Sequence, residues 1–198
     1  MSGPILTRPR NGGNSNLVID QLPPETRFIV PENVAQFQYE SLALLGIGRE
    51  RLCCIPDDET WWLETLYYSP DSQHSGGGVP PVDRWFRERI YTQVGVTGQL
   101  PRRRVFISRR SMRSRRIVNE PEIEHFLTEL GFEVCLPESL SVAEQVTLFS
   151  ETELIVGLGY WNFWGDSIPN PGNRPDIFVP LNRLTDVVRW ALGTDDRR

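Results

Sequence analysis

The sequence contains no lysine, and all 21 of its basic residues are arginines. This absence excludes a phosphate loop of the GxxxxGK[ST] type, although residues 76–78 are three consecutive glycines. No stretch approaches the roughly 18 apolar residues that a membrane-spanning helix needs. The amino-terminal residues lack the apolar centre of a secretory signal. We therefore expect residues 1–19 to be a disordered lead-in and the protein to be cytoplasmic, with a peripheral association with membranes as the alternative.

Cysteine and histidine are also scarce. The three cysteines, Cys53, Cys54 and Cys135, form no CxxC pair, and only two histidines are present. A zinc site is therefore not expected. We expect all three cysteines to be buried thiols in a reducing compartment.

The arginines are unevenly distributed along the chain. Eight arginines and one acid, Glu120, give residues 101–120 a net charge of +7, which leaves −12 for the rest of a chain whose net charge is −5. Proteins that bind long nucleic acids are usually basic overall, so no nucleic-acid partner is expected. A basic island on an acidic body instead favours a small anionic ligand such as a phosphate group.

The first part of the chain alternates apolar runs with segments of helical spacing. Strands are predicted at 27–30 and 52–55, with a weaker candidate at 65–68, and helices at 34–45 and 82–94. Gly46 is expected to end the first helix. The order strand, helix, strand favours a parallel sheet. The Gly- and Pro-rich residues 69–81 are expected to form a surface loop.

The second part has a clearer pattern. Strands are predicted at 105–107, 132–135 and 154–156, separated by two helices. Asn119 with Glu122, and Ser141 with Glu144, are predicted to form capping boxes at the two helix starts. The first of these helices is predicted to face the core with four apolar residues, Ile123, Phe126, Leu127 and Leu130. Gly131 is predicted to end it. The succession β-α-β-α-β predicts an α/β fold with a Rossmann-like sheet.

The arginine-rich residues 108–116 follow the strand at 105–107 and lead into the next helix. Ligands of open α/β sheets bind beyond the carboxyl ends of the strands, and helix amino termini attract anions. Forked guanidinium groups suit bidentate contact with phosphate oxygens. We therefore predict a phosphate site here, with a solvated loop that pairs with nearby acids as the alternative.

Residues 104–157, RVFISRRSMRSRRIVNEPEIEHFLTELGFEVCLPESLSVAEQVTLFSETELIVG, resemble glycosyltransferase family 61. The shared features are a strand followed by SRR, a second arginine-rich step with an Asn-Glu pair, a GFEV strand and a helix with a Glu-Gln pair. A looser similarity covers residues 20–95. The resemblance implies two Rossmann-like halves in a truncated GT-B architecture. The halves are expected at 20–95 and 102–192, with the donor bound by the second.

Members of that family are inverting transferases that mostly use UDP-sugars and need no metal ion. The resemblance thus implies transfer of a sugar from a nucleotide-sugar donor to a glycan or protein hydroxyl, as in polysaccharide biosynthesis, with no cofactor. Matched position by position, it assigns donor binding to Ser108, Arg109, Arg110, Arg115, Arg116, Asn119, Glu120 and Gln145. For Asn119 and Glu120, a helix cap and a favourable interaction with the helix dipole are equally good explanations.

After Gly157 the chain departs from the family pattern. LGYWNFWGDS stands where the family continues with a His-Gly-Ala-Gly-Leu segment, so we expect a shortened member or a fragment. The alternative function is an inactive remnant that binds nucleotide or serves as an interaction domain. No catalytic base is assigned; the residues considered are His74, Asp57, Asp58 and Glu59. An aromatic patch either stacks on a ligand or packs in the core: Trp161, Phe163 and Trp164.

Overall fold

The computed structural model describes residues 18–56, 58–67, 80–98, 100–157, 166–168 and 175–194. The chain divides into two compact units, which are described separately below. The first unit comprises Met1–Thr97 with Ser141–Val146, and the second comprises Gly98–Leu140 with Thr147–Arg198. Among the described residues, every helix is too short or too polar to cross a bilayer.

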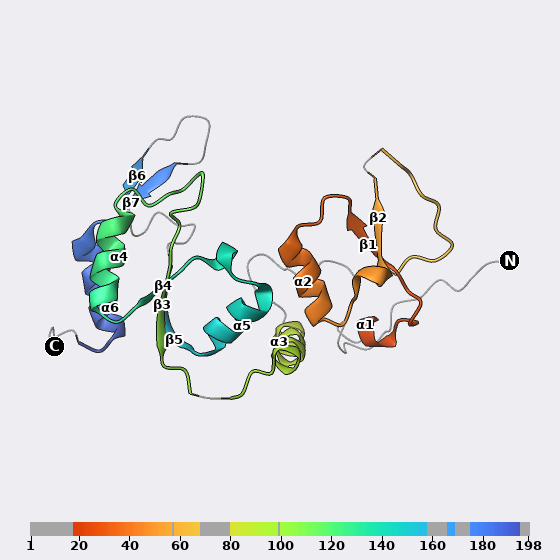
Figure 1. Cartoon of the computed structure of the whole chain (residues 1–198), viewed down its shortest axis with the longest axis horizontal. Coiled ribbons are helices and arrows are strands. Elements are labelled where there is room, and N and C mark those ends of the chain that lie inside the picture. Colours follow the sequence, from red (N-terminus) through yellow and green to blue (C-terminus); the bar gives the residue numbers. More distant parts are fainter. Residues whose placement is uncertain are drawn as a thin grey trace. The chain divides into compact units, whose positions relative to one another are not determined.

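The first unit contains a pair of parallel strands. Its elements are α1 (Val18–Gln21), β1 (Phe28–Pro31), α2 (Gln36–Leu44), a 3₁₀ turn (Arg49–Arg51), β2 (Leu52–Ile55) and α3 (Pro80–Val94) (Figure 1). β1 and β2 run parallel, with Phe28 opposite Leu52 and Pro31 opposite Ile55. The predicted strand–helix–strand order is confirmed, and so is the helix predicted at 82–94.

Gly46 ends α2 as predicted. Its φ of +82° is a conformation that a glycine adopts without strain. The Gly46 N–H donates to the Ala43 carbonyl and the Ile47 N–H to the Leu42 carbonyl, both at 2.9 Å, which is the Schellman pattern. The strand predicted at 65–68 is wrong for the described residues 65–67. They belong to no described sheet, and their side chains are exposed. An apolar run forms a strand only where a neighbouring strand pairs with its backbone N–H and carbonyl groups.

The second unit is built on a three-stranded parallel sheet (Figure 1). Its elements are β3 (Arg103–Ile107), α4 (Glu120–Glu129), β4 (Glu133–Cys135), a 3₁₀ turn (Pro137–Ser139), the second half of α5 (Val142–Ser150), β5 (Thr152–Gly157), β6 (Asp166–Ile168), β7 (Asp176–Phe178) and α6 (Leu181–Ala191). The strand order is β4-β3-β5, and Val105 of β3 lies opposite Glu133 on one side and Ile155 on the other. The predicted α/β class and the β-α-β-α-β succession are confirmed.

The last two strands of the unit lie outside the three-stranded sheet and form a separate pair. β6 and β7 form an antiparallel pair, with Asp166 opposite Phe178, and α6 follows β7 after two residues. Neither the pair nor α6 was among the predicted elements. α6 packs against α4, because Leu184 and Val188 share a hydrophobic cluster with Ile123 and Leu127.

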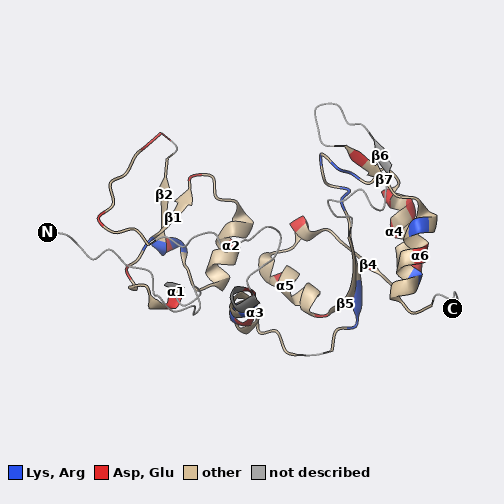
Figure 2. Cartoon of the chain, turned by 180° about the vertical axis from the view of Figure 1, so that it is seen from behind, with Lys and Arg blue, Asp and Glu red and all other residues tan. Residues whose placement is uncertain are grey.

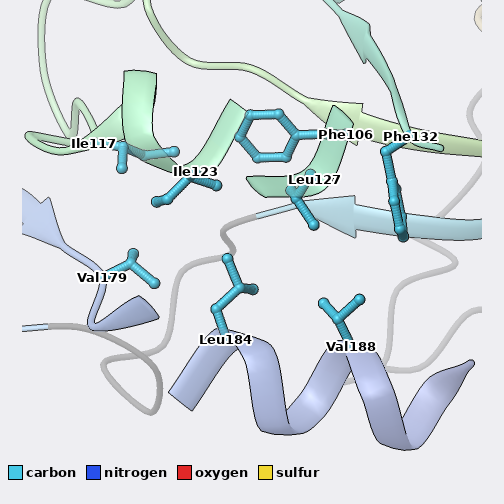
Figure 3. Packing of buried hydrophobic residues seen from close by; sticks show 8 residues of the cluster. All are labelled: Phe106, Ile117, Ile123, Leu127, Phe132, Val179, Leu184 and Val188. Carbon is cyan, nitrogen blue, oxygen red and sulfur yellow. The ribbon is translucent and has the colours of Figure 1, made fainter. Parts of the chain in front are cut away.

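The central strand β3 is buried on both faces. Val105 and Phe106 are both completely buried and, as neighbours in a strand, they point to opposite faces. Phe106 packs in a hydrophobic cluster whose side chains Figure 3 shows facing one another. Its other members are Ile117, which precedes α4, Ile123 and Leu127 of α4, Phe132, which precedes β4, Val179, which follows β7, and Leu184 and Val188 of α6. Val105 packs instead with Cys135 and with Leu148 of α5. The predicted core stripe of α4 is confirmed.

For the two helices of the sheet crossovers, two of the three predicted ends are confirmed. Gly131 closes α4 with φ +81°, with the Phe132 N–H donating to the Leu127 carbonyl at 3.0 Å. At the start of α5, the Ser141 N–H and hydroxyl both donate to Glu144 Oε2 at 2.7 Å, which confirms the capping box. These hydrogen bonds lower the pKa of Glu144. The start of α4 differs from the prediction and is described with the site.

The cysteines are free thiols, but they are not all buried as predicted. Cys135 is buried, Cys53 is half-buried and Cys54 is exposed. The difference follows from strand alternation, because Cys53 and Cys54 are neighbours in β2 and point to opposite faces. Burial is the main cause that raises the pKa of the Cys135 thiol.

Candidate anion-binding site

Residues 108–119, here called the arginine loop, connect the carboxyl end of β3 to α4. Five arginines lie in it: Arg109, Arg110, Arg113, Arg115 and Arg116. Figure 2 shows this loop as a blue segment separate from the blue at the other end of β3. The loop thus occupies the edge of the sheet at which ligands of α/β folds bind.

The arginine loop begins with a buried serine. Ser108 is only 2% exposed, and its N–H donates to the Cys135 carbonyl at 2.8 Å, which continues the pairing of β3 with β4. Its hydroxyl accepts a hydrogen bond from the Arg110 N–H at 3.3 Å. Ser108 therefore fixes the direction in which the chain leaves the sheet.

Glu120 connects the loop to the start of α4. Its side chain is buried, and Oε1 accepts a hydrogen bond from the Arg109 N–H at 2.5 Å. The Arg109 side chain in turn crosses the loop, with Nε donating to the Arg115 carbonyl at 2.9 Å. Arg115 adopts a left-handed backbone with φ 55°, which is unusual for a residue with a side chain. These contacts close the loop into a compact turn.

The second half of the loop pairs with β7. The Ile177 N–H donates to the Arg116 carbonyl and the Val118 N–H to the Ile177 carbonyl, both at 2.8 Å. Asn119 then clamps Val179: its amide Nδ2 donates to the Val179 carbonyl at 2.8 Å, and its Oδ1 accepts from the Val179 N–H at 3.0 Å. Residues 116–119 of the loop are thereby joined to residues 177–179.

The clamp corrects the prediction for the start of α4. Asn119 occupies the N-cap position, but its side chain makes no capping hydrogen bond, and Glu122 is exposed. The capping box predicted for this pair is therefore wrong. The amide is instead needed by Val179, whose buried N–H and carbonyl would otherwise lack partners.

Asp176 is the acidic residue that the sequence analysis missed. It lies at the first position of β7 and is 4% exposed. Its Oδ1 accepts from the Arg116 N–H at 2.8 Å, and its Oδ2 accepts from Arg116 Nε at 3.2 Å and Nη2 at 2.8 Å. The hydrogen bond to Asp176 raises the pKa of Arg116, whose side chain remains 56% exposed. A three-residue strand carries no periodic pattern that could have identified this carboxylate.

Arg110 and Arg113 are exposed, as Arg116 is. Arg110 forms a long ion pair of 3.5 Å between its Nη1 and Glu124 Oε2. The other carboxylate oxygen of Glu124 is buried without a hydrogen-bond partner among the described residues. Exposed guanidinium groups at this edge can bind an anion that approaches from solvent.

The basic stretch of the sequence is divided in two by β3. Arg103 pairs with Glu133 and Glu151, and Arg104 pairs with Glu153. These two arginines begin the strand, whereas the arginine loop follows its end. The single basic island expected from the sequence is therefore wrong, because β3 has acidic partners at one end and a loop at the other.

The remaining predicted residues lie elsewhere. Gln145 belongs to α5, in the segment grouped with the first unit, and its N–H donates to the Ser141 carbonyl at 3.0 Å. Asp58 and Glu59 are exposed. Five further positions discussed from the sequence lie outside the described residues: Asp57, His74, Trp161, Phe163 and Trp164. Within the described ranges no three His, Cys, Asp or Glu side chains gather as a metal site requires, and metal independence stays a prediction.

One comparison relates the chain to a known protein family. A family model described as Glycosyltransferase 61 matches residues 16–159. No curated protein matches the chain, and no solved structure matches it. The matched residues include the whole arginine loop and the sheet, whereas β7 with Asp176 lies beyond them.

Proposed function

The chain belongs to glycosyltransferase family 61, and on that premise we propose that it transfers a sugar from a UDP-linked donor to a hydroxyl group of a glycan or protein. Family membership supports a glycosyltransferase in general. The nature of the donor, the inversion of the sugar's configuration and the independence from metal are parts of the proposal. So is the assignment of the two units to a truncated GT-B architecture.

The observation that carries the proposal is the position of the arginine loop. It lies at the carboxyl end of the central strand and is held by backbone and carboxylate contacts to α4 and β7. In sugar transfer the nucleoside diphosphate leaves, and negative charge develops on it. A loop of fixed guanidinium groups stabilises that charge where no metal ion does so. Arg109 and Arg116 are the residues that we expect to contact the diphosphate.

An inverting transfer also needs a general base for the acceptor hydroxyl. None is assigned here, and this leaves the second candidate function, a nucleotide-binding protein without transferase activity. The observation in its favour is the sequence after Gly157, which differs from the family's His-Gly-Ala-Gly-Leu segment. Binding and turnover must therefore be measured separately.

The test is a calorimetric titration with UDP in the absence of divalent metal, followed by an assay of UDP release from a UDP-sugar. We expect saturable binding that Arg109→Ala weakens at least about tenfold, equivalent to the ~1.4 kcal/mol that a charged hydrogen bond contributes. Arg103→Ala is the matched control, because this arginine pairs with acids at the other end of β3. We expect its affinity to equal that of the wild type.

The outcomes separate the two candidates. Binding with UDP release that Arg109→Ala abolishes supports the transferase. Binding without release by any of a panel of UDP-sugars supports the nucleotide-binding protein. A folded wild-type chain that does not bind UDP, or an Arg103→Ala variant that loses as much affinity as Arg109→Ala, contradicts the assignment of the donor site to the arginine loop.

A further inference from the structure

We propose that Asp176 is a positioning residue of the donor site: from β7 it fixes the Arg116 guanidinium so that the free edge of this group faces the diphosphate. The inference rests on the proposed function, because it concerns how the same site binds its donor. It adds a residue that lies outside the part of the chain matched by the family model, which ends at residue 159.

Among the described residues, the geometry of the pair divides the guanidinium into an edge that the carboxylate occupies and an edge without a protein partner. Nε and Nη2 of Arg116 both donate to Oδ2 of Asp176. The planar group has five N–H donors, so those on Nη1 and the second one on Nη2 point away from the carboxylate. The side chain of Arg116 is 56% exposed and that of Asp176 only 6%. The buried acid thus aims the exposed base outward.

Asp176 also fixes the backbone from which Arg116 extends. Its Oδ1 accepts the Arg116 N–H at 2.8 Å, immediately after Arg115 with its left-handed φ of 55°. One carboxylate therefore holds both the main chain and the side chain of the same residue. Pre-organisation of this kind removes the cost of ordering a long side chain when the ligand binds.

A carboxylate beside an anion site has an effect in the opposite direction. Its negative charge offsets that of Arg116 and repels a diphosphate. If Asp176 acted only through charge, its neutralisation would tighten the binding of UDP. If it acts through position, neutralisation weakens binding although the site becomes more positive. The sign of the change therefore distinguishes the two roles.

The experiment is a calorimetric titration of the full chain with UDP, comparing wild type, Asp176→Asn, Arg116→Ala and the double variant. Asparagine retains an oxygen for the Arg116 N–H and removes the charge. We expect Asp176→Asn to raise the dissociation constant about tenfold, in the range of coupling measured for contacting groups. In the Arg116→Ala background we expect the same substitution to change the constant less than about twofold, since the residue through which Asp176 acts is gone.

Arg116→Lys provides a second readout that does not require any change at Asp176. Lysine keeps the positive charge but has no fork for the carboxylate to orient. We expect it to bind UDP as weakly as Arg116→Ala, with the thermal unfolding temperature of every variant recorded beside its affinity. Wild-type affinity in Arg116→Lys would overturn the inference even if Asp176→Asn did not fold.

The failure of this inference differs from the failure of the proposed function. A wild-type chain that does not bind UDP overturns both. A wild-type chain that binds UDP, combined with unchanged or tighter binding by Asp176→Asn, overturns the positioning role alone. Weakening of equal size in the presence and absence of the Arg116 side chain would also overturn it, because the effect would then not pass through Arg116.

Discussion

The two ends of β3 carry the same residue type in opposite surroundings. At the amino end, Arg103 and Arg104 are paired with glutamates of β4, β5 and the turn before β5. At the carboxyl end, the arginines extend from a loop whose backbone N–H groups donate to Glu120 and Asp176. Only three strand residues, 105–107, roughly 10 Å of extended chain, lie between the two groups.

The comparison shows that arginine content alone does not define a binding site. At the amino end each guanidinium lies against carboxylates on neighbouring strands, and exposed ion pairs of this kind contribute only about 0.2–1 kcal/mol each. At the carboxyl end Glu120 and Asp176 accept main-chain N–H groups, which gives the loop a fixed shape. An anionic ligand can therefore bind to a loop whose shape is already fixed, whereas the arginines at the amino end are already paired with carboxylates.

The largest expected effect on stability comes from a substitution at the centre of β3, between the two ends compared above. Phe106 is completely buried at the centre of the larger cluster (Figure 3), so Phe106→Ala should lower the free energy of unfolding by about 3–5 kcal/mol. Urea denaturation measures this value. Ile155→Ala on the neighbouring strand is the control: its side chain is 47% exposed, and we expect a change within about 0.5 kcal/mol. Equal losses would contradict the position of the core.

A smaller effect should be confined to the carboxyl end. Asn119→Ala leaves the buried N–H and carbonyl of Val179 without partners, and we expect a loss of about 2 kcal/mol in the free energy of unfolding. Glu122→Ala tests the other interpretation of Asn119, since a capping box would need both residues. We expect Glu122→Ala to change stability by less than about 0.5 kcal/mol. A large loss in that variant would restore the capping box and contradict the clamp.

The smallest effect belongs to the amino end and depends on pH. The hydrogen bond from Arg103 lowers the pKa of Glu133 below its ordinary value of 4.5. A lowered pKa in the folded state stabilises the fold above the unfolded value, and this contribution disappears as the pH falls through the folded value. Glu133→Gln should therefore cost at most about 1 kcal/mol at pH 7, because both side chains are partly exposed.

The same substitution should cost nothing once the pH lies below the folded pKa of Glu133. Chemical denaturation of wild type and variant at a series of pH values from 7 into the acid range measures the difference and the pH at which it disappears. A high salt concentration at pH 7 should also reduce the difference, since exposed pairs are screened. A cost that is independent of both pH and salt would mean that Glu133 stabilises the fold by packing rather than by its charge.

The elements that the sequence predicted are those with a local pattern. The strands of the three-stranded sheet are short apolar runs, and α4 shows its buried residues Ile123 and Leu127 at helical spacing. Gly46 and Gly131 mark helix ends because few other residues tolerate their positive φ. For these features the neighbouring residues contain all the necessary information.

The features that were missed depend on distant partners. Asn119 before a helix has the local pattern of a cap, and only the position of Val179, 60 residues later, gives its amide another use. Asp176 likewise lies 60 residues from Arg116 in a strand too short for a periodic signal. The pairing of Arg103 with Glu133 required the register of β3 with β4. Pattern reading supplies none of these long-range contacts.

The pairing of the arginine loop with β7 also makes completion of the loop depend on residues that are synthesised after the sheet. All three strands of the sheet have been synthesised by residue 157. The second half of the loop, however, takes hydrogen bonds from residues 177–179. The cluster around Phe106 also takes Val179, Leu184 and Val188 from this late part of the chain. The loop and one face of the core are therefore completed together, and a fluctuation that detaches β7 would loosen both.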